Sequence, residues 1–194
     1  MRTLFALLGM LAIWMVIGSG PSLMAEGTKS GTASPERIAR GKYLVQLGGC
    51  TDCHSPKVMS PNGPIPDPIK AFSGHQESAK LPEIPKNVLG PDKWMALTNS
   101  DLTAWVGPWG VSFAANLTPD PATGIGGWTE EMWLKTLKTG KHLGTGRQIL
   151  PPMPWQGIGT LKQEDLKDIY AYFMSLKPVR NAVPQPIPPA QPGK

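Results

Sequence analysis

The sequence predicts a small all-α fold in which a few helices are joined by long loops. Three stretches place apolar residues at helical spacing, and no stretch alternates apolar and polar residues as a half-buried strand does. The 194 residues also include 22 prolines and 22 glycines, which interrupt regular structure. A single helical domain with much irregular chain between its helices accounts for both observations.

The first expected helix is "SPERIARGKYLVQLGG", residues 34–49. Ser34 can cap its first turn, Pro35 suits the first helical position, and the Gly48–Gly49 pair ends it. Residues 55–127 should then be mostly irregular, with one short helix within residues 91–106.

The two remaining helices lie in the C-terminal half. In "WTEEMWLKTLKTGKH", residues 128–142, Thr129 is the expected cap and Gly140 the expected end. In "TLKQEDLKDIYAYFMSLK", residues 160–177, the apolar stripe is formed by Leu166, Ile169, Phe173 and Leu176.

The N-terminus has the pattern of an export signal. Arg2 precedes an apolar run, Leu4–Ile17, which is shorter than the ~20 residues needed to cross a bilayer. Small residues lead to Ala25, so a cleaved signal peptide is expected, with an uncleaved anchor as the alternative. The expected segments are a signal peptide at 1–25, a flexible leader at 26–33, one helical domain at 34–177 and a Pro-rich tail at 178–194.

The charge and the cysteine count exclude two broad classes. The formal net charge is +5, and removing residues 1–25, whose single charged side chain is Arg2, leaves +4. This mild charge is spread along the chain, so nucleic acid is not an expected partner. Two cysteines three positions apart cannot form a disulfide framework.

Both cysteines belong to "CTDCH", residues 50–54, which is the attachment pattern of c-type haem. The thiols of Cys50 and Cys53 can form thioethers to the two vinyl groups, and His54 then supplies a nitrogen to the iron. The alternative is a thioredoxin-like dithiol, but that fold requires a strand before the motif. Here a helix ending at Gly48–Gly49 precedes it.

The second axial ligand is expected to be Met153 in "LPPMPW". Prolines on both sides stiffen this loop and can hold a thioether toward a metal. The alternative is that Met153 fills a gap in a tight turn. His75 and His142 are rival ligands, although a histidine near a helix end also has an ordinary electrostatic role.

Four segments together resemble the class I monohaem cytochrome c domains of bacteria, and the resemblance covers nearly all of residues 34–190. They are "ARGKYLVQLGGCTDCH", "FAANLTPDPATGIGGW", "GRQILPPMPW" and "LKQEDLKDIYAYFMSLKPVRNAVP". The second is similar to a segment of the cytochrome subunits that serve periplasmic alcohol and aldehyde dehydrogenases. The resemblance implies a cytochrome c fold around one covalently bound haem c, with His54 and Met153 as axial ligands. It also implies that Gly41 and Val45 of the first helix cross Tyr170 or Tyr172 of the last.

Four further residues are candidates to bind the haem propionates: Asn116, Thr118, Arg147 and Trp155. Alternatively, "NLTPD" is a turn sequence and Trp155 a wall of the haem pocket. Lys135, Lys138 and Lys141 near the Met153 loop form a candidate docking cluster, or else a solvated helix face.

A haem iron bound on both sides has no open site for a substrate, so the expected function is single-electron transfer rather than catalysis. We expect a periplasmic carrier, or the electron-accepting subunit of a dehydrogenase or oxidase complex. Its expected partners are a dehydrogenase, a terminal oxidase or another cytochrome, with membrane contact only if the N-terminal segment is retained. The alternative is a peroxidase-like or thiosulfate-oxidising haem enzyme, or a sensor, with a displaceable sixth ligand and His75 for acid–base chemistry.

Overall fold

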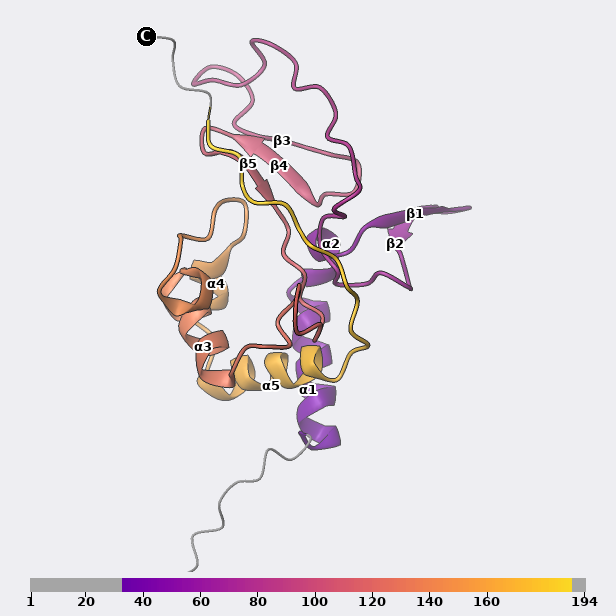
Figure 1. The fold of residues 1–194 in the computed structure, drawn as a ribbon, viewed down its shortest axis with the longest axis vertical. Helices are drawn as coiled ribbons and strands as arrows, with labels where there is room; N and C mark the ends of the chain where they lie inside the picture. Colours follow the sequence, from indigo (N-terminus) through magenta and orange to yellow (C-terminus); the bar gives the residue numbers. More distant parts are fainter. Residues whose placement is uncertain (1–32, 190–194) are drawn as a thin grey trace, which may run out of the picture. The chain divides into compact units, whose positions relative to one another are not determined.

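A computed structural model describes residues 33–189 of the chain (Figure 1). The expected signal peptide and nearly all of the leader lie outside the described residues, as do residues 190–194. Of the helices that are described, none is both long enough and apolar enough to cross a membrane. The helical elements are α1 (Pro35–Leu47), α2 (Cys50–His54), α3 (Glu130–Thr139), the 3-10 turn η1 (His142–Gly144), α4 (Trp155–Ile158) and α5 (Gln163–Met174).

Two small antiparallel sheets occupy the region between α2 and α3. The first is a hairpin of β1 (Lys57–Ser60) and β2 (Gly63–Pro66). The second has the order β3–β4–β5, formed by β3 (Leu97–Thr98), β4 (Ala104–Gly107) and β5 (Gly110–Phe113). Figure 1 shows this sheet on one side of the described chain, with α1, α3 and α5 on the other.

The sheets correct the expectation of a purely all-α fold. The prediction of a short helix within residues 91–106 is wrong, because that stretch contains β3 and most of β4. These strands have at most four residues, and β5 is buried at three consecutive positions. Strands this short, covered on both faces, leave no alternation of apolar and polar residues in the sequence.

The expected helix ends are confirmed for α1 and α3. The Ser34 hydroxyl accepts from the Arg37 N–H (3.5 Å), and the Thr129 hydroxyl accepts from the Met132 N–H (3.1 Å). Gly140 ends α3 in the left-handed region, at φ 67°. A Cβ there would also overlap the indole ring of Trp155, so this position needs glycine on two counts.

Helices α1 and α5 cross at Gly41, where the backbones come into direct contact. A Cβ at Gly41 would overlap the Asp168 carbonyl oxygen and lie 2.9 Å from the Tyr172 Cβ. The crossing against Tyr172 is therefore one of the two that the resemblance implied. At its edge, the Arg37 Nε donates to the Asp168 carboxylate (2.7 Å), and Arg40 pairs with Asp165 (2.8 Å).

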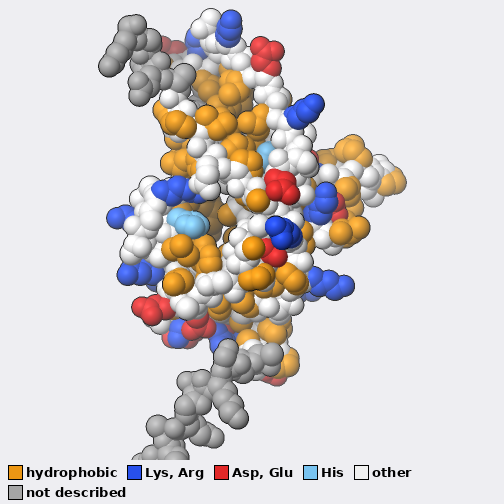
Figure 2. All heavy atoms as spheres, viewed as in Figure 1, with side chains coloured by type: hydrophobic (Ala, Val, Ile, Leu, Met, Phe, Trp, Pro, Cys, Tyr) orange, Lys and Arg blue, Asp and Glu red, His pale blue; other side chains and the backbone are white. Residues whose placement is uncertain are grey.

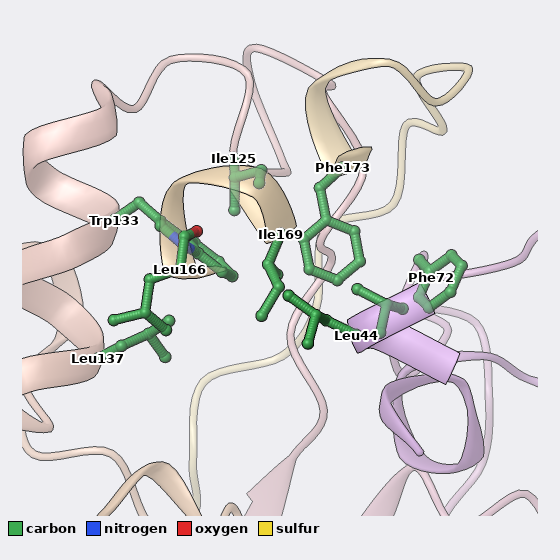
Figure 3. Packing of buried hydrophobic residues seen from close by; sticks show 9 residues of the cluster. Leu44, Phe72, Ile125, Trp133, Leu137, Leu166, Ile169 and Phe173 are labelled. Carbon is green, nitrogen blue, oxygen red and sulfur yellow. The ribbon is translucent and has the colours of Figure 1, made fainter. Parts of the chain in front are cut away.

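One apolar core lies between these helices and α3 (Figure 3). Its central residues come from all three helices and from two loop positions, and they are Leu44, Val45, Phe72, Ile125, Trp133, Leu137, Leu166, Ile169 and Phe173. The Trp133 indole N–H donates to the Leu166 carbonyl (2.9 Å), so the largest ring in this core has no unpaired polar group. The helical arrangement confirms the expected small cytochrome c fold, to which two sheets are added.

The close approach at Gly41 predicts a large effect of a single methyl group. Gly41→Ala should lower the free energy of unfolding of the holoprotein by about 2–3 kcal/mol, because the helices must separate. Denaturant titration would measure it. Gly157→Ala in α4 is the matched control, since a Cβ there meets no atom within 4 Å. That control should be neutral or stabilising by about 0.5–1 kcal/mol, and equal losses in both variants would contradict this account.

Candidate functional site

The two thiols and the following histidine lie on the single turn of α2. Gly49, in the left-handed region at φ 61°, turns the chain from α1 into this helix. Cys50 and Cys53 are free and half-buried, whereas His54 is buried. Cys50 packs against the apolar core. The turn thus presents two thiols and an imidazole beside that core.

Lys57 closes the other end of this turn. Its ammonium group donates to the carbonyls of Asp52 and Ser55 (2.7 Å each) and to that of Asp101 (3.2 Å). The first two carbonyls belong to the C-terminal end of α2, where a cation is favourable. The third comes from the loop between β3 and β4, so Lys57 ties α2 to the larger sheet.

His54 is held in the state that a metal ligand requires. Its Nδ1 lies 2.8 Å from the Ala115 carbonyl oxygen, which can only accept, so Nδ1 carries the proton. Burial lowers the pKa of the imidazole, which favours the neutral ring, although the bond to Ala115 opposes this shift. The unprotonated Nε2 is then free to bind iron, with its ring oriented by the second hydrogen bond.

The cysteines do not have the properties of a reactive dithiol. Burial raises the pKa of the Cys50 thiol to about 11 and also raises that of Cys53, with the Asp52 carboxylate adding to both shifts. Redox dithiols instead have a depressed pKa in an electropositive setting. The environment of this turn disfavours the thioredoxin-like alternative.

Met153 lies in the loop between η1 and α4, half-buried and packed against the apolar core. The loop borders a cavity of about 380 Å³, lined by Gln148, Ile149, Pro151, Pro152, Met153, Pro154, Trp155 and Gln156. Figure 2 shows a hollow in the middle of one face of the molecule, with apolar side chains around it. A thioether that borders a cavity can reach a group bound there. A thioether enclosed by other side chains could not.

A single segment, residues 112–118, contacts both the His54 turn and the Met153 loop. Ala115 accepts from His54, and the Ser112 hydroxyl donates to the Pro151 carbonyl (2.5 Å). The Trp109 indole N–H in turn donates to the Ser112 oxygen (3.2 Å). Sequence reasoning missed all three residues. A backbone carbonyl has no residue preference, and neither the serine nor the tryptophan belongs to a motif.

The rival histidines both have aromatic packing partners within the fold. His75 is buried, with Nδ1 2.9 Å from the Thr103 hydroxyl and its ring 4.8 Å from that of Phe113. His142 lies in η1 and meets the Trp128 ring edge-on, with centroids 5.2 Å apart. Both packing arrangements favour an ordinary structural role.

The hydrogen bonds of Asn116 and Thr118 favour the turn interpretation of "NLTPD". Both residues are buried, and the side-chain Oδ1 of Asn116 accepts from the backbone N–H and the hydroxyl of Thr118 (3.0 and 2.7 Å). The Asn116 amide donates to the Val179 carbonyl (2.8 Å). Their polar groups are thus engaged within the protein, holding the chain after α5 against this turn. Propionate binding by either residue stays a prediction.

Arg147 and Trp155 lie on the two sides of the Met153 loop. Trp155 lines the cavity and packs on Gly140, which favours its alternative role as a wall. The Arg147 guanidinium donates to the Gln148 carbonyl (3.3 Å), and it forms no ion pair among residues 33–189. Arg147 is the one charged residue of the four candidates, and its charge is therefore available to a propionate.

One of the three lysines in the expected docking cluster is hydrogen-bonded within the protein. The Lys138 ammonium donates to the carbonyls of Gly159 (2.6 Å) and Leu161 (3.0 Å), so it serves the end of α4. Lys135 and Lys141 are exposed.

The residues at this site fit a haem c. The fit rests on the chemistry of the donors: two thiols three positions apart, a neutral imidazole whose free nitrogen is Nε2, and a thioether at a cavity. Cys50 and Cys53 would form the covalent attachment, and His54 and Met153 would be the axial ligands. The site can therefore hold one redox-active iron.

The sequence is similar to cytochrome c subunits of bacterial dehydrogenases, whereas no protein-family model matches it. It is 38% identical over 143 residues to the cytochrome c subunit of the quinone alcohol dehydrogenase of Gluconobacter oxydans, covering 73% of this chain and 22% of that subunit. The gluconate 2-dehydrogenase cytochrome c subunit of Pantoea cypripedii is 28% identical over 151 residues, covering 77% of this chain and 26% of the subunit. The fructose dehydrogenase cytochrome subunit of Gluconobacter japonicus is 29% identical over 164 residues, covering 83% and 26%. The chain thus spans about a quarter of the length of these relatives.

The hydrogen bonds of Asn116 predict a loss of stability without a change at the haem. Asn116→Ala removes the partners of Thr118 and Val179 and should lower the free energy of unfolding by about 2–3 kcal/mol. Haem absorbance and reduction potential should stay close to those of the wild type. Asn62→Ala, at an exposed loop position, is the control. A shifted potential in Asn116→Ala alone would instead support propionate binding.

Proposed function

We propose that this chain is an exported c-type cytochrome that carries single electrons through one covalently bound haem. The observation that carries the proposal is the geometry of His54, whose Nδ1 is hydrogen-bonded to the Ala115 carbonyl and whose Nε2 is left for the iron. The similarity to cytochrome c subunits over most of the chain supports the same conclusion.

Each part of the site has a separate role in this function. When bound, the haem supplies an iron that alternates between the ferric and ferrous states. Cys50 and Cys53 attach it covalently, and the Ala115 carbonyl keeps the His54 ring in one tautomer and one orientation. Met153 would supply the second ligand of the iron, and a thioether in that role would raise the reduction potential. Cys50 and Met153 both pack against the apolar core, which would place the haem beside it.

The names of the relatives suggest the partners. The relatives are named as cytochrome subunits of alcohol, gluconate and fructose dehydrogenases. By analogy, the chain accepts electrons from a dehydrogenase and delivers them to a terminal oxidase or another cytochrome. Catalysis would belong to the dehydrogenase. The periplasm is the proposed location, because both the attachment of haem c and the N-terminal signal point to that compartment. If residues 1–25 are retained, the protein would also be held at the membrane.

The placement of His75 disfavours the alternative of a haem enzyme. Acid–base chemistry requires a group that can reach a bound substrate. His75 is 1% exposed, hydrogen-bonded to Thr103 and packed against Phe113. It is the acid–base candidate that the sequence offered, and it is engaged in the interior.

The attachment itself predicts a mass. Protein exported by a host that attaches haem c should, after denaturation, retain a mass increase of one haem, and extraction with acidified acetone should not remove it. Cys50→Ala with Cys53→Ala should abolish this increase, because no thioether can form. Free thiols at both positions in exported wild-type protein, detected by alkylation and mass spectrometry, would refute the proposal.

The axial ligand predicts a change in potential. Met153→His should remove the weak long-wavelength absorbance band of thioether-bound ferric haem. It should also lower the reduction potential by on the order of 0.1 V, because imidazole favours the ferrous state less than a thioether does. Met95→His is the matched control, since Met95 is 74% exposed. An unchanged spectrum and potential in Met153→His would mean that another residue is the ligand.

A further inference from the structure

The Met153 loop is held by very few hydrogen bonds of its own. Pro151, Pro152 and Pro154 have no N–H to donate. In the described part of the chain, residues 150–153 form one hydrogen bond, which the Pro151 carbonyl accepts from the Ser112 hydroxyl (2.5 Å). The prolines restrict the shape of the loop, but they do not tie it to the rest of the protein. Ile149, just before this segment, donates to the Gly140 carbonyl (2.7 Å), and Ser112 supplies the hydrogen bond within residues 150–153.

The orientation of the Ser112 hydroxyl follows from its second neighbour. The Trp109 indole nitrogen can only donate, and it lies 3.2 Å from the Ser112 oxygen. The hydroxyl therefore accepts from Trp109 and directs its own proton to the Pro151 carbonyl. Two hydrogen bonds in such a chain polarise and strengthen one another.

The larger sheet holds this pair in place. Ser112 is buried on β5, opposite Trp105 of β4. Trp109 lies in the β4–β5 turn and folds back so closely that a Cβ at Gly107 would contact its ring. On the other edge of β5, Val111 exchanges backbone hydrogen bonds with Ile187 (2.7 and 2.9 Å). The donor to the Met153 loop thus stands on a strand that is paired on both sides.

We propose that Ser112, oriented by Trp109, is a positioning residue that keeps the Met153 thioether on the iron. It does so through the backbone of Pro151, two residues before Met153, and not as a ligand itself. The larger sheet between α2 and α3 then supports the axial-ligand loop from outside the helical core. The inference rests on the proposed function, because it takes Met153 as the axial ligand.

The consequence is a difference in how easily a small ligand displaces Met153. An exogenous ligand binds only when the thioether is off the iron, so its apparent affinity rises with the population of that state. Losing one hydrogen bond of ordinary strength should raise this population about fivefold. A residue that merely supports the fold would lower global stability and leave this local equilibrium unchanged.

The experiment is a titration of the ferric holoprotein with imidazole, followed by the change in absorbance. Ser112→Ala should lower the apparent dissociation constant about fivefold, and Ser112→Thr, which keeps the hydroxyl, should restore a value near that of the wild type. Trp109→Phe removes the indole N–H and should change the constant in the same direction by a smaller factor.

Trp105→Phe is the matched control for Trp109→Phe. Trp105 stands beside Ser112 in the same sheet, but its indole N–H donates to the Leu102 carbonyl (2.8 Å). This variant should bind imidazole like the wild type, even if the protein becomes less stable. Denaturant unfolding of each variant separates the two effects. If Ser112→Ala does not fold, the two tryptophan variants still decide the question.

Two different failures can be told apart. If Met153→His removes the thioether band but Ser112→Ala and Trp109→Phe leave the imidazole constant within experimental error, the positioning role is refuted and the proposed ligand stands. Equal effects of Trp109→Phe and Trp105→Phe would refute it too. If wild-type protein shows no thioether band, Met153 is not the ligand and the positioning role fails with it, whereas the covalent haem is tested separately by the mass measurement.

Discussion

The site depends on one short segment that contacts both the turn of His54 and the loop of Met153, the two proposed ligands. Within residues 112–118, the Ala115 carbonyl holds His54 and the Ser112 hydroxyl holds the Met153 loop. These two parts are about 100 positions apart in the sequence, so nothing local relates them. Because both are hydrogen-bonded to the same segment, that segment fixes their positions relative to each other. Two ligands of one iron would require such mutual placement.

The helical core supplies the rigid body on which this segment rests. Helices α1 and α5 touch at Gly41, and α2 follows α1 after the turn at Gly49. The position of the thiols is therefore tied to the crossing of the helices. The segment is attached to the same body, because the Leu117 N–H donates to the carbonyl of Phe72, a core residue. Asn116 and Thr118 further bind it to the chain that follows α5.

The region between α2 and α3 is more than a connection. It carries the larger sheet, whose β5 presents Ser112, and it carries Lys57, which closes the C-terminal end of α2. The C-terminal chain joins the same sheet through Ile187, and Asn181 donates to the carbonyls of Ser73 and His75. In this loop-rich region, hydrogen bonds between segments distant in sequence fix the backbone. In a helix, hydrogen bonds between neighbouring residues would do so.

The sequence by itself indicated the haem motif, Met153 as the preferred ligand, the three main helices, and the caps of the first two of them. Each of these depends on residues close together in the chain: the spacing of Cys50, Cys53 and His54, the prolines around Met153, or a hydroxyl before a helix. Only the tertiary structure decided that residues 55–127 contain two sheets and that Asn116 and Thr118 are engaged within the protein. It also decided that Ala115 contacts His54 and that Ser112 contacts the Met153 loop. Strands of four residues leave no readable period, and a backbone carbonyl accepts a hydrogen bond whatever its side chain. These contacts join segments far apart in the chain, so no local pattern of residue types records them.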